Sequence, residues 1–186
     1  MGVLHRRFLP ALLLAAIAAL IVPGTATAAS PAKVAPGDGV SAQAHIYWIY
    51  NDHSGKCLET NDNAGHNGAL VQQWGCSGQP STQWRLQFVR FEGTVEVVTI
   101  RHVAHPGKCL EIPDWSTANG AQAQLWDCLN QSSAEWRWTT TPGGGQQFVN
   151  QHSGKCLEIP DWSTADGAVA QQWQCLGQGS AVWRLW

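Results

Sequence analysis

The chain has 186 residues, and its 11 lysine and arginine residues against 13 acidic residues give a formal net charge of −2 at pH 7. This near balance, without a basic run or a basic-aromatic patch, argues against nucleic acid and anionic membranes as partners. Only 13% of the residues are charged while 11 are tryptophan, which indicates a compact domain that presents aromatic and amide groups rather than ion pairs.

The first 29 residues have the pattern of a secretory signal peptide. Basic residues precede an apolar run from Phe8 to Val22, and small residues follow up to Ala28. The apolar run is about 15 residues long, against the roughly 20 that a spanning helix needs, so a cleaved signal is favoured over a membrane anchor. Residues 30–44 are rich in alanine, proline, glycine and serine and are interpreted as a flexible leader or linker. The sequence therefore predicts a secreted, extracellular protein.

Residues 45–186 contain one sequence unit three times, with expected boundaries near 45–91, 92–141 and 142–186. Each unit has a Gly-Lys-Cys block, a second cysteine 19 positions later, a Gln-x-Trp-x-Cys block and another tryptophan ten residues after the first. Such a unit cannot bury its own apolar face, so repetition predicts that the three units share one core.

Six cysteines at one repeated spacing in an exported chain predict three disulfides. The repeat selects one pairing, because each unit must close on itself in the same way. The predicted pairs are Cys57–Cys76, Cys109–Cys128 and Cys156–Cys175. The rival interpretation is zinc, since a histidine lies four residues before the first cysteine of each unit. We favour no metal: the histidine more simply opens a turn, and Pro106 followed by Gly107 suits the middle of a type II turn.

The local sequence favours strands throughout. Residues 87–91 and 94–100 form a hairpin pattern rich in β-branched and aromatic residues, and residues 136–139 and 147–149 form its counterpart at the next junction. Each unit adds two short strands, around Lys-Cys-Leu-Glu and around the Gln-x-Trp block. No segment has a sustained helical period, so we expect about four strands per unit and twelve in all.

Three Gln-x-Trp units in register with three cysteine pairs resemble the ricin B-type lectin family of carbohydrate-binding modules. The resemblance covers residues 45–186. It implies an all-β fold, a β-trefoil of three homologous four-stranded repeats with pseudo-threefold symmetry and one disulfide in each repeat. It also implies a six-stranded barrel capped by three hairpins, an arrangement without open edges. The core candidates are the second tryptophan of each unit and the leucine after its first cysteine: Trp84, Trp136, Trp183, Leu58, Leu110 and Leu157.

The resemblance further implies a sugar site in each repeat, made by an acid two residues after the first cysteine and by the aromatic residue of Gln-x-Trp. These groups suit a sugar, whose C–H face stacks on an aromatic ring and whose hydroxyls bond to carboxylates and amides. The glutamine of Gln-x-Trp either holds backbone groups of the next turn or contacts ligand. The chain departs from the family in two respects: the acid is glutamate rather than the commoner aspartate, and serine replaces the usual asparagine at Ser81, Ser133 and Ser180.

Repeats two and three carry an additional Pro-Asp-Trp sequence, where repeat one has Asn61-Asp62-Asn63. A tryptophan in a polar loop favours a ligand-stacking role, with packing over the disulfide as the alternative. We therefore predict similar sites in repeats two and three and a weaker one in repeat one. The candidate carbohydrate-binding residues are Glu111, Asp114, Trp115, Gln124 and Trp126 in repeat two, Glu158, Asp161, Trp162, Gln171 and Trp173 in repeat three, and Glu59, Gln72 and Trp74 in the weaker first site.

The function expected from these features is that of a secreted, non-catalytic and monomeric lectin without cofactor. Glycoside hydrolysis needs two carboxylates about 5 to 10 Å apart, and no such pair is marked by the sequence. Motifs for serine, cysteine or metal-dependent hydrolysis are also missing from it. The alternative is a protein-binding trefoil, such as a protease inhibitor or an accessory subunit, because a fold alone does not specify a ligand.

Overall fold

The computed structural model describes residues 45–186, and the predicted signal peptide and linker lie outside these residues. Each repeat supplies four strands. Repeat one contains β1 (Ile46–Asn51), β2 (Cys57–Thr60), β3 (Ala69–Trp74) and β4 (Gln83–Glu92). Repeat two contains β5 (Val95–His102), β6 (Lys108–Glu111), β7 (Gln124–Asp127) and β8 (Glu135–Thr140). Repeat three contains β9 (Gln146–Asn150), β10 (Cys156–Glu158), β11 (Gln171–Trp173) and β12 (Trp183–Leu185).

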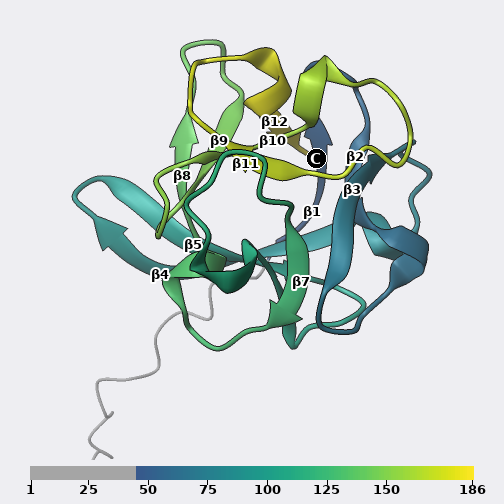
Figure 1. Cartoon of the computed structure of the whole chain (residues 1–186), viewed down its shortest axis with the longest axis horizontal. Coiled ribbons are helices and arrows are strands. Elements are labelled where there is room, and N and C mark those ends of the chain that lie inside the picture. The colour runs from purple at the N-terminus through teal and green to yellow at the C-terminus, as the bar shows by residue number, and fades with distance from the viewer. Residues whose placement is uncertain (1–44) are drawn as a thin grey trace, which may run out of the picture. The chain divides into compact units, whose positions relative to one another are not determined.

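The first and last strands of the repeats close into a six-stranded barrel. Antiparallel pairs join β1 to β4, β4 to β5, β5 to β8, β8 to β9, β9 to β12, and β12 back to β1. The remaining strands form the hairpins β2–β3, β6–β7 and β10–β11. They meet one another through the β3–β7 pair and two isolated bridges, and Figure 1 views the domain with these hairpins around its centre. The predicted barrel and three hairpins are therefore confirmed, with twelve strands and no α-helix in the described residues.

The core is built from the same positions of each repeat. Trp84, Trp136 and Trp183 are fully buried, together with the three predicted leucines. Each indole Nε1 donates to the carbonyl oxygen of the leucine of its own repeat, at 2.8 to 3.0 Å. The large rings thus fill the barrel while their one polar atom is satisfied, as buried indoles require.

The three disulfides join the predicted partners, with Cα–Cα distances of 5.1 to 5.2 Å. Each bridge fastens the start of a hairpin strand to the turn after its partner strand. No free cysteine occurs among residues 45–186, and no group of three metal-ligating side chains lies close enough there to hold a metal ion. Within the same residues no helix has the length and apolar character needed to cross a bilayer.

One predicted turn differs in type. Lys108 N donates to His105 O at 2.8 Å, which closes a tight turn, but Gly107 does not adopt the positive φ that a type II turn demands. Gly55 and Gly154 do, with φ of 68° and 70° in the equivalent loops. Repeat two has one more residue in this loop than the others. The longer loop turns without a left-handed glycine, so the type II prediction was wrong.

Candidate functional site

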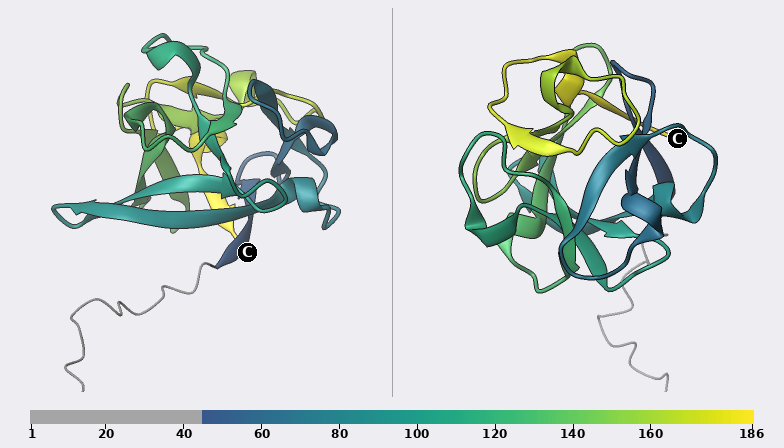
Figure 2. Two further views of the ribbon diagram at one scale, coloured as in Figure 1. Left: turned by 90° about the horizontal axis from the view of Figure 1, so that it is seen from below. Right: turned by 45° about the vertical axis from the view of Figure 1, so that its right-hand side comes forward.

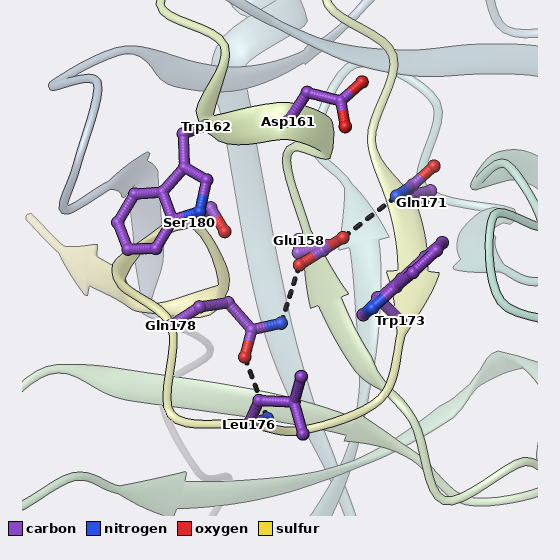
Figure 3. Close-up of a pocket in the computed structure, with 8 residues that line it drawn as sticks. All are labelled: Glu158, Asp161, Trp162, Gln171, Trp173, Leu176, Gln178 and Ser180. Carbon is purple, nitrogen blue, oxygen red and sulfur yellow. Dashed lines mark hydrogen bonds between the residues drawn. The ribbon is translucent and has the colours of Figure 1, made fainter.

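A cleft on repeat three collects all five residues predicted for that repeat. Glu158 ends β10, Gln171 and Trp173 belong to β11, and Asp161 and Trp162 lie in the 3-10 turn η5 (Pro160–Trp162). These side chains line one open cavity of about 220 Å³, together with Leu176, Gln178 and Ser180. In the view of Figure 3 the Glu158 carboxylate lies between the two indoles, with Asp161 on one side and Gln178 on the other.

Repeat two forms the same cleft, with a volume of about 200 Å³. Its lining includes the five residues predicted for that repeat, Glu111, Asp114, Trp115, Gln124 and Trp126. The structure therefore brings together every predicted residue of both sites.

The carboxylate at the floor of each cleft is buried, and each of its oxygens accepts a hydrogen bond. Glu158 Oε1 accepts from Gln171 Nε2 at 2.9 Å and Oε2 accepts from Gln178 Nε2 at 2.7 Å. In repeat two the same acceptor atoms of Glu111 bond to Gln124 and Gln131. Burial raises the pKa of Glu111, while these donors and Ser133 oppose the rise. Amide donors thus fix the direction of the carboxylate and offset part of its desolvation.

The loop tryptophans adopt an unusual backbone conformation. Asp114 and Trp115 both have a φ of 55°, and Asp161 and Trp162 have φ of 52° and 55°. Left-handed backbone is costly for a bulky side chain, and such positions cluster at binding sites. The rings of Trp115 and Trp162 remain about half exposed, at 52% and 51%.

Each loop tryptophan is supported by a histidine of the following repeat rather than by the core. The Trp162 ring meets the His53 ring edge to face, with centroids 4.9 Å apart, and Trp115 meets His152 in the same way at 5.0 Å. His53 Nε2 also donates to the Trp162 carbonyl oxygen at 3.1 Å. The indoles therefore make contacts between repeats, while about half of each residue stays exposed.

A model of the ricin-type beta-trefoil lectin domain matches residues 45–185. The chain belongs to this lectin family. Among solved structures it is similar to ThreeFoil, a designed three-fold symmetric protein, with 31% identity and a TM-score of 0.69 over 75% of this chain and 96% of that one. An exo-beta-1,3-galactanase from Clostridium thermocellum is 28% identical with the same TM-score, over 79% of this chain but 31% of the enzyme, whose lectin module is the matching part.

Another solved structure, the agglutinin of Abrus precatorius, shares the fold at 22% identity and a TM-score of 0.59, over 79% of this chain and 50% of that chain. These likenesses confirm the β-trefoil fold expected from the sequence.

The first repeat of the lectin domain has a cleft of its own. Glu59, Gln72 and Trp74 line it, and Gln72 Nε2 donates to Glu59 Oε1 at 2.9 Å, as in the other repeats. Asp62 and Asn63 repeat the left-handed pair, with φ of 52° and 54°, but asparagine stands where the other repeats have tryptophan. This cleft is larger, about 370 Å³, and it lacks the second indole wall.

The glutamine that begins each Gln-x-Trp block does not hold backbone of the next turn, so that interpretation was wrong. Its amide binds the glutamate instead, across the β-hairpin. In repeats one and three the middle residue of the block makes backbone contacts: Gln73 Nε2 donates to Ser163 O and Ala165 O, both at 2.9 Å. Gln172 binds Ser116 O and Ala118 O in the same way.

Among the cleft residues that the sequence interpretation missed is one glutamine in each repeat. Gln79, Gln131 and Gln178 follow the second cysteine by three positions in every repeat, and all three line a cleft. Two of them donate directly to the buried glutamate. Their recurrence was a signal that could have been used, but the family pattern directed attention to the serine two residues later. That serine has a role too, since Ser81 Oγ donates to Glu59 Oε2 at 3.2 Å.

Proposed function

We propose that the chain is a secreted lectin whose clefts in repeats two and three bind sugar residues of a polysaccharide or glycan. The observation that carries this proposal is the pair of half-exposed tryptophans, Trp115 and Trp162, each held in left-handed backbone beside a cleft. A position that only had to pack over a disulfide would not need so costly a combination of ring and backbone. The N-terminal sequence pattern supports secretion.

The cleft chemistry suits a pyranose ring. Trp162 and Trp173 expose apolar faces, 51% and 37% accessible, on which the C–H face of a sugar can stack. Asp161 has no hydrogen-bond partner among the described side chains and is exposed, so its carboxylate is free to accept from hydroxyl pairs. Glu158 accepts one donor per oxygen and keeps a further lone pair on each.

Two clefts of one geometry on a single domain favour a polymeric or multivalent ligand. Binding one cleft raises the effective concentration of sugar at the other, so the avidity exceeds the affinity of either cleft without any new contact. The similarity to the lectin module of an exo-beta-1,3-galactanase makes β-1,3-galactan the first polysaccharide to test.

A glycan and polysaccharide array probed with the oxidised protein tests the proposal. We expect binding to a coherent set of sugars, including at least one polysaccharide, and competition by a free monosaccharide. Silence across the array, from protein shown to be folded by circular dichroism, would exclude the lectin function. It would favour the protein-binding alternative, in which the scaffold is kept and the sugar sites are lost.

A further inference from the structure

Three aromatic residues gather on the outer face of the barrel where β1 meets β12. Trp48 and Trp186 lie directly opposite one another and exchange two backbone hydrogen bonds of 3.1 Å. The ring of Tyr50 lies 5.0 Å from that of Trp186, at an interplanar angle of 57°. Trp186 is 68% exposed. We call Trp48, Tyr50 and Trp186 the aromatic face.

The internal symmetry shows that the fold does not require these aromatic rings. The cross-strand pair Trp48–Trp186 corresponds to Thr99–Gln87 between β5 and β4, and to Gln147–Thr139 between β9 and β8. Tyr50 corresponds to Arg101 and Val149. The same barrel strands thus pair at the other two junctions without an aromatic residue at these positions.

Trp48 also has a feature that destabilises the fold. Its indole Nε1 is buried and has no acceptor among the described residues. A buried donor left without a partner has lost its hydrogen bond to water without a replacement, which destabilises the folded state. Threonine, which repeat two has at this position, would avoid that cost, so the ring is better explained by a role outside folding.

The aromatic face borders an apolar pocket next to the cleft of repeat one. Trp48, Cys76, Gly78 and Trp186 line a cavity of about 280 Å³ without a charged group. The next residues of the same loop, Gln79 and Pro80, line the repeat-one cleft. A single short turn, residues 76–80, therefore separates the two hollows.

We propose that the aromatic face is an additional sugar subsite, which binds a further residue of the same carbohydrate polymer that occupies the repeat-one cleft. This rests on the proposed lectin function. A platform of rings without charged groups stacks on the apolar face of a sugar but offers little to its hydroxyls. The aromatic face therefore binds a free sugar weakly. When the adjacent cleft holds one residue of a polymer, the effective concentration of the next residue at the aromatic face is high, so the weak contact adds to the affinity. The aromatic face would thus replace the loop tryptophan that repeat one lacks, and it would make this repeat prefer long carbohydrate chains.

The experiment compares the wild-type chain with Trp186→Thr, which installs the residue of repeat two, and with Trp48→Thr. Phe91→Ala serves as the matched control, because Phe91 is 60% exposed on the β4–β5 hairpin, which extends away from the rest of the domain (Figure 2, left). Mobility is measured in native gels that contain β-1,3-galactan, xylan or arabinogalactan, and galactose and xylose are titrated by calorimetry.

We expect both threonine variants to lose about tenfold in affinity for the retarding polysaccharide, while their monosaccharide affinity stays unchanged and their thermal midpoint does not fall. Phe91→Ala should behave like wild type. Equal retardation of wild type and both threonine variants would overturn the subsite and leave the lectin function standing. So would an equal loss in Phe91→Ala, or a parallel loss of monosaccharide binding. If the wild-type protein binds none of these polysaccharides or monosaccharides, the proposed lectin function is contradicted and the subsite proposal falls with it.

Discussion

The ring nitrogen Nε2 of His102 lies 3.3 Å from the carbonyl oxygen of Ser81 and joins repeat two to repeat one. Asparagine makes the same connection at the other two junctions, from Asn51 Nδ2 to Ser180 O at 2.7 Å and from Asn150 Nδ2 to Ser133 O at 2.8 Å. Ser81 in turn donates its hydroxyl to Glu59. One of three equivalent contacts behind the lectin clefts is thus made by a group that can be protonated.

His102 should make the stability of the domain depend on pH. Burial lowers its pKa to about 4, with a smaller contribution from His105, which stacks on it. Nδ1 is buried without a partner, so a second proton there has no acceptor. The unfolded chain takes up a proton near the ordinary pKa of about 6.5, whereas the folded chain does not. The folded state therefore has its full stability with respect to His102 above about pH 6.5, and it loses stability as the pH falls from there toward 4.

Urea unfolding of wild type and His102→Asn at pH 7.5 and 4.5 measures this effect. Wild type should lose on the order of 2 kcal/mol more than the variant between the two pH values. The asparagine variant keeps the contact to Ser81 in the form that the other repeats use, and all other titrating groups are common to both proteins. Equal losses in the two proteins would contradict the assignment of the buried neutral imidazole.

Removing both loop tryptophans should abolish the binding of short glycans without unfolding the domain. In Trp115→Ala with Trp162→Ala, each lost ring is about half exposed and lies outside the buried core, so the thermal midpoint should change little. Array binding and a thermal melt check the two halves of this prediction. Retained glycan binding in a folded double variant would exclude these rings as the stacking surface.

Gln178 is predicted to position the repeat-three carboxylate. Its Nε2 donates to Glu158 Oε2 at 2.7 Å, and its Oε1 accepts from Leu176 N at 2.8 Å. Gln178→Ala leaves Glu158 with one donor, so we expect about a tenfold loss of affinity at that cleft, equivalent to about 1.4 kcal/mol. Calorimetry with the monosaccharide identified by the array checks it. Gln178→Glu, which keeps the length but places a carboxylate against a carboxylate, should be worse than alanine; an unchanged affinity in both would show that Gln178 does not act on the site.

The spacing of cysteine, leucine and tryptophan was enough to predict the barrel, the disulfides and the core, because each repeat must bury the same residues against a shared axis. Trp84 and Trp136, for example, are buried in equivalent environments, and each follows the tryptophan of its Gln-x-Trp block by ten residues. The glutamine contacts could not be predicted in this way. Gln131 and Gln178 bind the acid and each follows a residue with positive φ, Asn130 at 56° and Gly177 at 77°, a backbone conformation that the spacing of cysteine and tryptophan does not indicate. The sequence did not show that His102 is equivalent to Asn51 and Asn150, because the loop that follows it has one more residue than in the other repeats.

The two tryptophans of one repeat should differ sharply in what they contribute. Trp136 is fully buried and donates its indole N–H to Leu110 O at 3.0 Å, so Trp136→Ala removes a large ring from the barrel and leaves that carbonyl oxygen unpaired. A loss of about 3–5 kcal/mol is expected from the cavity. Trp173→Ala is the matched control, because this ring is 37% exposed on a cleft wall.

Trp173→Ala should keep nearly all of its unfolding free energy and lose sugar affinity at repeat three. Trp136→Ala should lose unfolding free energy but, while it is folded, keep that sugar affinity. Urea unfolding beside sugar titration separates the two effects. A stable Trp136→Ala protein would contradict the core assignment. A Trp173→Ala protein with normal affinity would show that this ring is part of the cleft wall without stacking on sugar.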